Sequence, residues 1–84
     1  MAHLFGATLN PIKGHLADFG AWIKAVKRAK KGGNVVMVEA TLLGAQVVRA
    51  RTSNAVARCR ENDLPIVPPN VLQIMDEALA EVRA

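Results

Sequence analysis

Two segments of the chain repeat hydrophobic residues at the period of an α-helix. Between residues 11 and 31 the spacings are four, three, four and three, and between residues 70 and 83 they are three, four and three. Such spacings place the apolar side chains on one face of an amphipathic helix. The apolar positions are Ile12, Leu16, Phe19, Ile23 and Val26 in the first segment and Leu72, Met75, Leu79 and Val82 in the second. We therefore expect helices over residues 11–31 and 70–83.

Start and stop signals frame the first of these helices. Asn10 is a favourable N-cap, and Pro11 is tolerated at the first helical position. Gly32 and Gly33 follow the last apolar repeat, and one of them is expected to take the left-handed conformation that closes a helix. Further along, residues 64–69 hold three prolines within five positions, which cannot lie inside a helix and predict an extended connector.

The central stretch, residues 34–63, admits three interpretations. In the first it is one helix of roughly 40 Å. This helix would carry a stripe of mostly small apolar side chains, with Gly44 beside it, that lets a partner helix approach closely. The stripe consists of Val36, Ala40, Leu43, Val47 and Ala50.

In the second interpretation the helix breaks near residues 51–53 and gives two helices, over 35–50 and 53–62. Thr52 or Ser53 would then cap the second helix, because a hydroxyl oxygen at the N-cap accepts a hydrogen bond from an unpaired backbone N–H.

In the third interpretation Val35–Leu42 and Gln46–Thr52 form a β-hairpin around Gly44, since β-branched residues are frequent in the first arm. An isolated two-stranded hairpin is only marginally stable in water, which favours the helical interpretations. The expected fold class is therefore all-α, a small bundle of three or four helices in which the central helix is either continuous or divided.

Length and composition limit the size of the core. The 84 residues correspond to a single domain that buries about 60–65% of the surface of its unfolded chain. A hydrophobic content of 51% is typical of a folded chain, and with only three aromatic residues the core must be aliphatic. Residues 1–9 are expected either to pack on their own domain or to dock as an apolar arm into a neighbouring subunit.

The formal net charge of +4 is unevenly distributed. It is +5 over residues 1–33, +1 over residues 34–63 and −2 over residues 64–84. The basic and acidic ends could attract each other within one chain or between copies. The cations near the end of the first helix, Lys27 and Lys31 among them, either complement the helix dipole or form a surface for nucleic acid, an acidic partner or lipid headgroups.

Residues 51–65, RTSNAVARCRENDLP, resemble the turn and second helix of homeodomain-like and Myb-like helix-turn-helix modules. A pattern R-T-x-x-A-V-x-x-R followed by L-x-L-P is common there, and the chain departs from that family at Arg49 and Ala50 and again at Asn62 and Asp63. The resemblance implies DNA binding, in which outward residues of the second helix reach base edges and flanking arginines contact phosphates. The nucleic-acid-binding residues predicted in this way, with two lysines of the first helix, are Arg51, Ser53, Asn54, Arg58, Arg60, Lys27 and Lys31.

A different function follows if the chain is an assembly or protein-interaction subunit that packs against copies of itself or a larger protein. The interface residues predicted for it are Leu4, Phe5, Ala40, Leu43, Gly44 and Val47. The arginines distinguish the two hypotheses. If they share one exposed face with the lysines, nucleic acid is favoured, whereas pairing with Glu39, Glu61 or Asp63 favours assembly.

The sequence carries no pattern typical of an enzyme. His3, His15 and Cys59 lack the spacing of metal ligands, and the adjacent Asp76 and Glu77 point in different directions. We therefore expect no catalytic site, metal, cofactor or small-molecule substrate. A single cysteine is typical of a reducing compartment, and no apolar run reaches the roughly 18 residues of a membrane span, so we expect a cytoplasmic protein.

Overall fold

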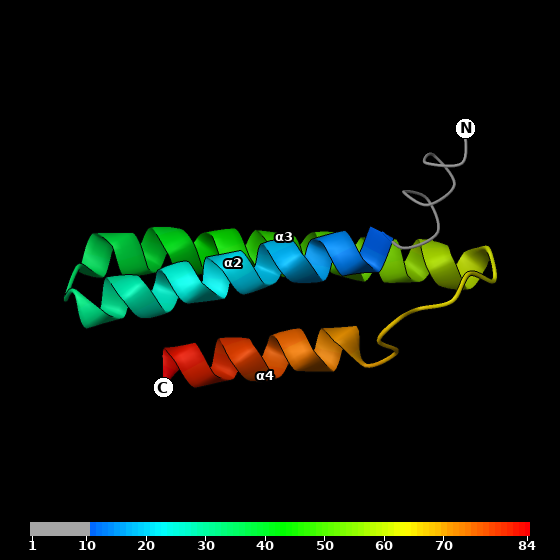
Figure 1. Ribbon diagram of the computed structural model, residues 1–84. Coiled ribbons are helices and arrows are strands. Elements are labelled where there is room, and N and C mark those ends of the chain that lie inside the picture. Colours follow the sequence, from blue (N-terminus) through cyan, green and yellow to red (C-terminus); the bar gives the residue numbers. More distant parts are fainter. Residues whose placement is uncertain (1–10) are drawn as a thin grey trace.

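The computed structural model describes residues 11–84, which form an all-α bundle of three helices (Figure 1). Helices α2 (Pro11–Lys31) and α3 (Val35–Glu61) lie antiparallel, and α4 (Val71–Arg83) packs against both. Because no strand occurs among the described residues, the β-hairpin interpretation is wrong. The predicted N-terminal arm, with its interface residues Leu4 and Phe5, lies outside the described part of the chain.

The turn between α2 and α3 is short because both of its ends are capped. Gly33 adopts the predicted left-handed conformation, with φ of 70°. The backbone N–H of Gly33 donates to Lys30 and that of Asn34 donates to Ala29, the two bonds of a Schellman motif. The side chain of Asn34 then accepts from the N–H of Met37 at 3.1 Å and so caps α3. Asn34 thus closes α2 through its backbone and caps α3 through its side chain.

Helix α3 is continuous across residues 51–53, so the interpretation with two helices is wrong. Thr52 does not cap a new helix. Its side chain is 0% exposed, and its hydroxyl donates to the carbonyl oxygen of Val48, one turn earlier, at 2.7 Å. The residues after it, Ala55, Val56 and Cys59, are buried against the rest of the bundle, which explains why the helix continues. The bond from the Thr52 hydroxyl to the Val48 carbonyl oxygen is a common alternative to capping for a threonine inside a helix.

The core is a thin layer between the three helices. Its buried apolar side chains are Ile12, Phe19, Ile23 and Val26 of α2, Ala45, Val48, Ala55, Val56 and Cys59 of α3, and Val71, Met75, Leu79 and Val82 of α4. The predicted apolar faces of α2 and α4 are therefore confirmed, with Leu16 and Leu72 only partly buried and Val71 added to the core. The radius of gyration is 14.4 Å, larger than the roughly 12 Å of a compact domain of this length, so the bundle is elongated.

Charged residues join α4 to the other helices. Arg49 of α3 donates two hydrogen bonds to Asp76, at 2.8 and 3.1 Å. Lys27 of α2 pairs with Glu81 at 3.8 Å, and Lys30 donates to the backbone oxygen of Val82 at 2.7 Å. The basic end of α2 thus contacts the acidic helix α4 within one chain.

Candidate interaction face of helix α3

Helix α3 has two apolar faces, and one of them points outward. The predicted stripe of Val36, Ala40, Leu43, Val47 and Ala50, here called the α3 stripe, is exposed along its whole length. Val36 is 74% exposed, Leu43 60% and Val47 42%. The face that packs on α2 and α4 buries Thr41, Ala45 and Val48 and partly buries Val38 and Leu42. Three large aliphatic side chains therefore lie at the surface while a threonine and an alanine are buried on the other side.

Gly44 lies beside the α3 stripe and is covered by Trp22 of α2. A Cβ atom on Gly44 would lie 2.5 Å from Cε3 of the Trp22 ring, which is far inside van der Waals contact. The close approach of a helix that was expected beside Gly44 is made by α2 of the same chain, whose Trp22 ring uses that space. Trp22 itself remains 40% exposed and extends the apolar surface from α3 onto α2.

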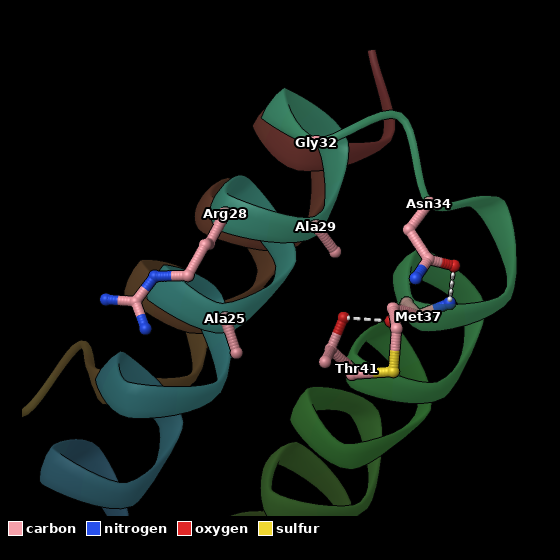
Figure 2. Close-up of a pocket in the computed structure, with 7 residues that line it drawn as sticks. All are labelled: Ala25, Arg28, Ala29, Gly32, Asn34, Met37 and Thr41. Carbon is pink, nitrogen blue, oxygen red and sulfur yellow. Dashed lines mark hydrogen bonds between the residues drawn. The ribbon is translucent and has the colours of Figure 1, made fainter.

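A groove of about 420 Å³ opens between the last turns of α2 and the first turns of α3 (Figure 2). Its lining residues are Ala25, Arg28, Ala29 and Gly32 from α2 and Asn34, Met37 and Thr41 from α3. Figure 2 shows Ala25 and Ala29 pointing toward Met37 and Thr41, and these short side chains leave the space between the helices unfilled.

The groove and the α3 stripe form one surface. Met37 lines the groove, is 47% exposed, and lies one residue after Val36 and three before Ala40 on α3. Residues three apart are neighbours on a helix surface, so Met37 connects the two features. Sequence reasoning did not identify the groove. The available signal was the run of small residues at 25, 29 and 32, spaced four and three along the first helix.

Two arginines continue the flank on which Trp22 lies. Arg51 and Arg58 follow Gly44 by seven and fourteen residues, which places all three on the same side of α3. Arg60 is two residues after Arg58, about 200° further around the helix, and so lies on the other flank. The three arginines are exposed and take part in no ion pair among residues 11–84.

The residues predicted to bind nucleic acid do not form one surface. Lys31 lies at the end of the bundle where α3 begins, whereas Arg60 is 25 residues along α3 from Val35, a distance of about 37 Å. Lys27 is already paired with Glu81. Ser53 is half-buried, and the exposed Asn54 continues the line of the α3 stripe. The turn that the helix-turn-helix resemblance requires at residues 51–53 is absent, because α3 runs through it.

Arg49, Asp76 and Cys59 lie outside the α3 stripe and the groove, and their contacts are structural. The hydrogen bond from Arg49 lowers the pKa of the Asp76 carboxyl below its ordinary value, and the same bond raises the pKa of Arg49. Cys59 is a free thiol inside the core. Among residues 11–84 no three histidine, cysteine or acidic side chains gather as metal ligands would, and no helix there combines the length and apolar content of a membrane span.

Neither known protein families, nor curated proteins, nor solved structures include a match to this chain.

Proposed function

We propose that the chain is a non-enzymatic protein-interaction module that binds another polypeptide through the α3 stripe, the exposed edge of Trp22 and the adjacent groove. One observation carries this proposal: α3 buries Thr41, Ala45 and Thr52 while it exposes Val36, Leu43 and Val47. Val48 and Val56 hold the opposite face of α3 inward, so the aliphatic side chains left outside can gain the roughly 25 cal/mol per Å² of buried apolar area only against another polypeptide.

The surface has the composition of a binding face. Contiguous exposed apolar residues typically mark sites of interaction, and an exposed tryptophan is among the side chains that contribute most to binding. The elongated shape of the bundle also leaves a large share of its residues accessible. The buried free thiol of Cys59 is compatible with the reducing cytoplasm, where we propose that the protein acts.

The test is site-specific photo-crosslinking in cells that express the full chain. A photoreactive phenylalanine replaces Leu43 or Val47 in the α3 stripe, or Val67 in the connector, which is 58% exposed and serves as a matched control. We expect discrete adducts with another polypeptide from positions 43 and 47 and none from position 67. Adduct formation should be lost when Val36→Asp is added.

Each crosslinking variant must first show the helical circular dichroism of the parent. Because these positions are exposed, substitutions there should change the free energy of unfolding by no more than about 0.5 kcal/mol. Equal labelling from all three positions, or no adduct from the α3 stripe, would contradict the proposed function.

A further inference from the structure

We infer that the polypeptide bound by the α3 stripe, Trp22 and the groove is an acidic amphipathic helix of another protein. This inference rests on the proposed function and adds the chemistry of the partner. The helix lies along the flank of the α3 stripe that carries Trp22 and the groove. Its apolar side chains cover Leu43 and Val47 and enter the groove, and its carboxylates face Arg51 and Arg58.

The charges on this flank are complementary to such a partner. Arg51 and Arg58 are seven residues apart, about 10 Å along α3, so acidic residues one heptad apart on a second helix can meet both. Arg28 adds a third exposed cation on the α2 side of the groove, with its guanidinium directed away from α3 (Figure 2). Two exposed carboxylates lie nearby, Asp18 four residues before Trp22 and Glu61 three residues after Arg58, so the three arginines exceed them by one positive charge.

The apolar part of the surface fits a helix in a groove. In that mode of recognition an amphipathic helix inserts side chains at positions i, i+3, i+4 and i+7 into a hydrophobic depression. The groove volume of about 420 Å³ lies within the range of cavities that hold ligand groups. Met37 at its wall has a flexible, polarisable side chain that adapts to an inserted group. Trp22 supplies an aromatic anchor between the groove and the arginines.

A second copy of the chain fits this flank less well. Each chain carries a formal charge of +4, and a pair formed through the same face would bring Arg28, Arg51 and Arg58 of one copy toward a second basic surface. Like charges brought together at an interface oppose association, whereas an acidic helix is attracted and steered toward the same site.

The probe for the test is a fluorescein-labelled helical peptide of three heptads, with leucine at a and d and glutamate at e and g. Its counterpart carries lysine at every e and g position. Fluorescence anisotropy measures the binding of each peptide to the full chain at 50 and 200 mM salt. We expect the acidic peptide to bind at least tenfold more tightly than the lysine peptide at 50 mM salt, and its affinity to fall at 200 mM salt.

Variants locate the contact. Arg51→Glu/Arg58→Glu should weaken the acidic peptide at least tenfold. Arg60→Glu/Arg83→Glu, which changes the net charge by the same amount away from this flank, should change its affinity less than threefold. Leu43→Asp should weaken it strongly while the helical circular dichroism stays that of the parent.

Other outcomes overturn the inference in distinguishable ways. Equal affinity for both peptides, abolished by Leu43→Asp, leaves an apolar binding face but refutes an acidic partner. Equal loss in the two double variants shows that net charge, and not this flank, attracts the peptide. A dimer in sedimentation velocity that Leu43→Asp dissociates assigns the face to a second copy. Failure of both peptides to bind when the chain is in 100-fold excess also refutes the acidic partner. Crosslinking from position 43 then decides the proposed function separately.

Discussion

The ring of Trp22 in α2 lies directly against Gly44 in α3, so closely that no side chain fits at position 44. This contact sets how near the two antiparallel helices lie at their middle. It also holds the tryptophan at the border between the core and the exposed α3 stripe. A structural contact and a feature of the proposed binding face therefore depend on the same pair of residues.

Gly44→Ala should lower the free energy of unfolding by about 1–2 kcal/mol. The added methyl group forces Trp22 to move, which costs about 1–3 kcal/mol, and alanine returns up to about 1 kcal/mol through its higher helix propensity. Chemical denaturation checks the sign, and the emission of the single tryptophan should shift to the red as its ring becomes more exposed.

Two further variants test the cause. In a Trp22→Ala background the clash is gone, so Gly44→Ala should stabilise by about 0.5–1 kcal/mol. Gly20→Ala in α2 should stabilise to a similar degree in the parent chain, because a Cβ atom at that position would lie in open space. A loss of stability from Gly44→Ala that persists without Trp22 would show that the ring is not responsible.

Substitutions at Thr52 distinguish a continuous α3 from a helix that is divided at residues 51–53. Its methyl and hydroxyl groups are both buried, and the hydroxyl bonds only to a backbone oxygen that the helix also uses. Thr52→Val should therefore leave the free energy of unfolding unchanged or raise it by up to about 1 kcal/mol, since it leaves no buried polar group unpaired. Thr52→Ser removes a buried methyl group and should cost about 1 kcal/mol.

If Thr52 were an N-cap, the serine variant would be the more stable of the two. Serine keeps a cap, whereas valine loses one at a cost of about 1 kcal/mol. Urea denaturation of the two variants therefore tests the helix continuity on its own. A stable serine variant beside a destabilised valine variant would restore the break at residues 51–53.

The sequence predicted the boundaries of α2 closely, because an apolar period and signals at both ends agree there. It did not decide the path of α3 at Thr52, since a threonine hydroxyl can either cap a helix or bond back to it, and burial by other helices makes the choice. It also could not orient α3, which has apolar residues on two faces. The groove arises from two segments that meet only in the folded chain, so Ala25 and Met37 gave no joint signal.

Asp76 should make the stability of the bundle depend on pH. Its pKa is lowered in the folded chain by the hydrogen bond from Arg49, so the unfolded chain binds more protons in acid. The stabilisation is complete above the ordinary carboxyl pKa of about 3.9 and is lost as pH falls through the lower pKa of the folded state. Because the Asp76 side chain is 56% exposed, the contribution at pH 7 should be only about 0.2–1 kcal/mol.

Urea denaturation of the parent and of Asp76→Asn between pH 7 and pH 2.5 measures this contribution. The two free energies of unfolding should differ at pH 7 and converge in acid. The same convergence should persist in a Glu39→Gln background, which keeps the Arg49–Asp76 pair. A difference that grows as the pH falls would contradict the assigned direction.

Duplex DNA should bind only weakly and without sequence preference. The turn of a helix-turn-helix is absent, and the cations Lys31, Arg51 and Arg60 lie on different flanks and ends of the bundle. Residual attraction between a basic chain and phosphates should weaken steeply with salt as counterions are released. Anisotropy with labelled duplexes of unrelated sequence, at 50 and 200 mM salt, should therefore give equal affinities that fall together. Selective binding of one duplex, retained at 200 mM salt and lost in a folded Arg51→Ala/Arg58→Ala/Arg60→Ala variant, would favour nucleic-acid recognition over the protein interaction proposed for α3.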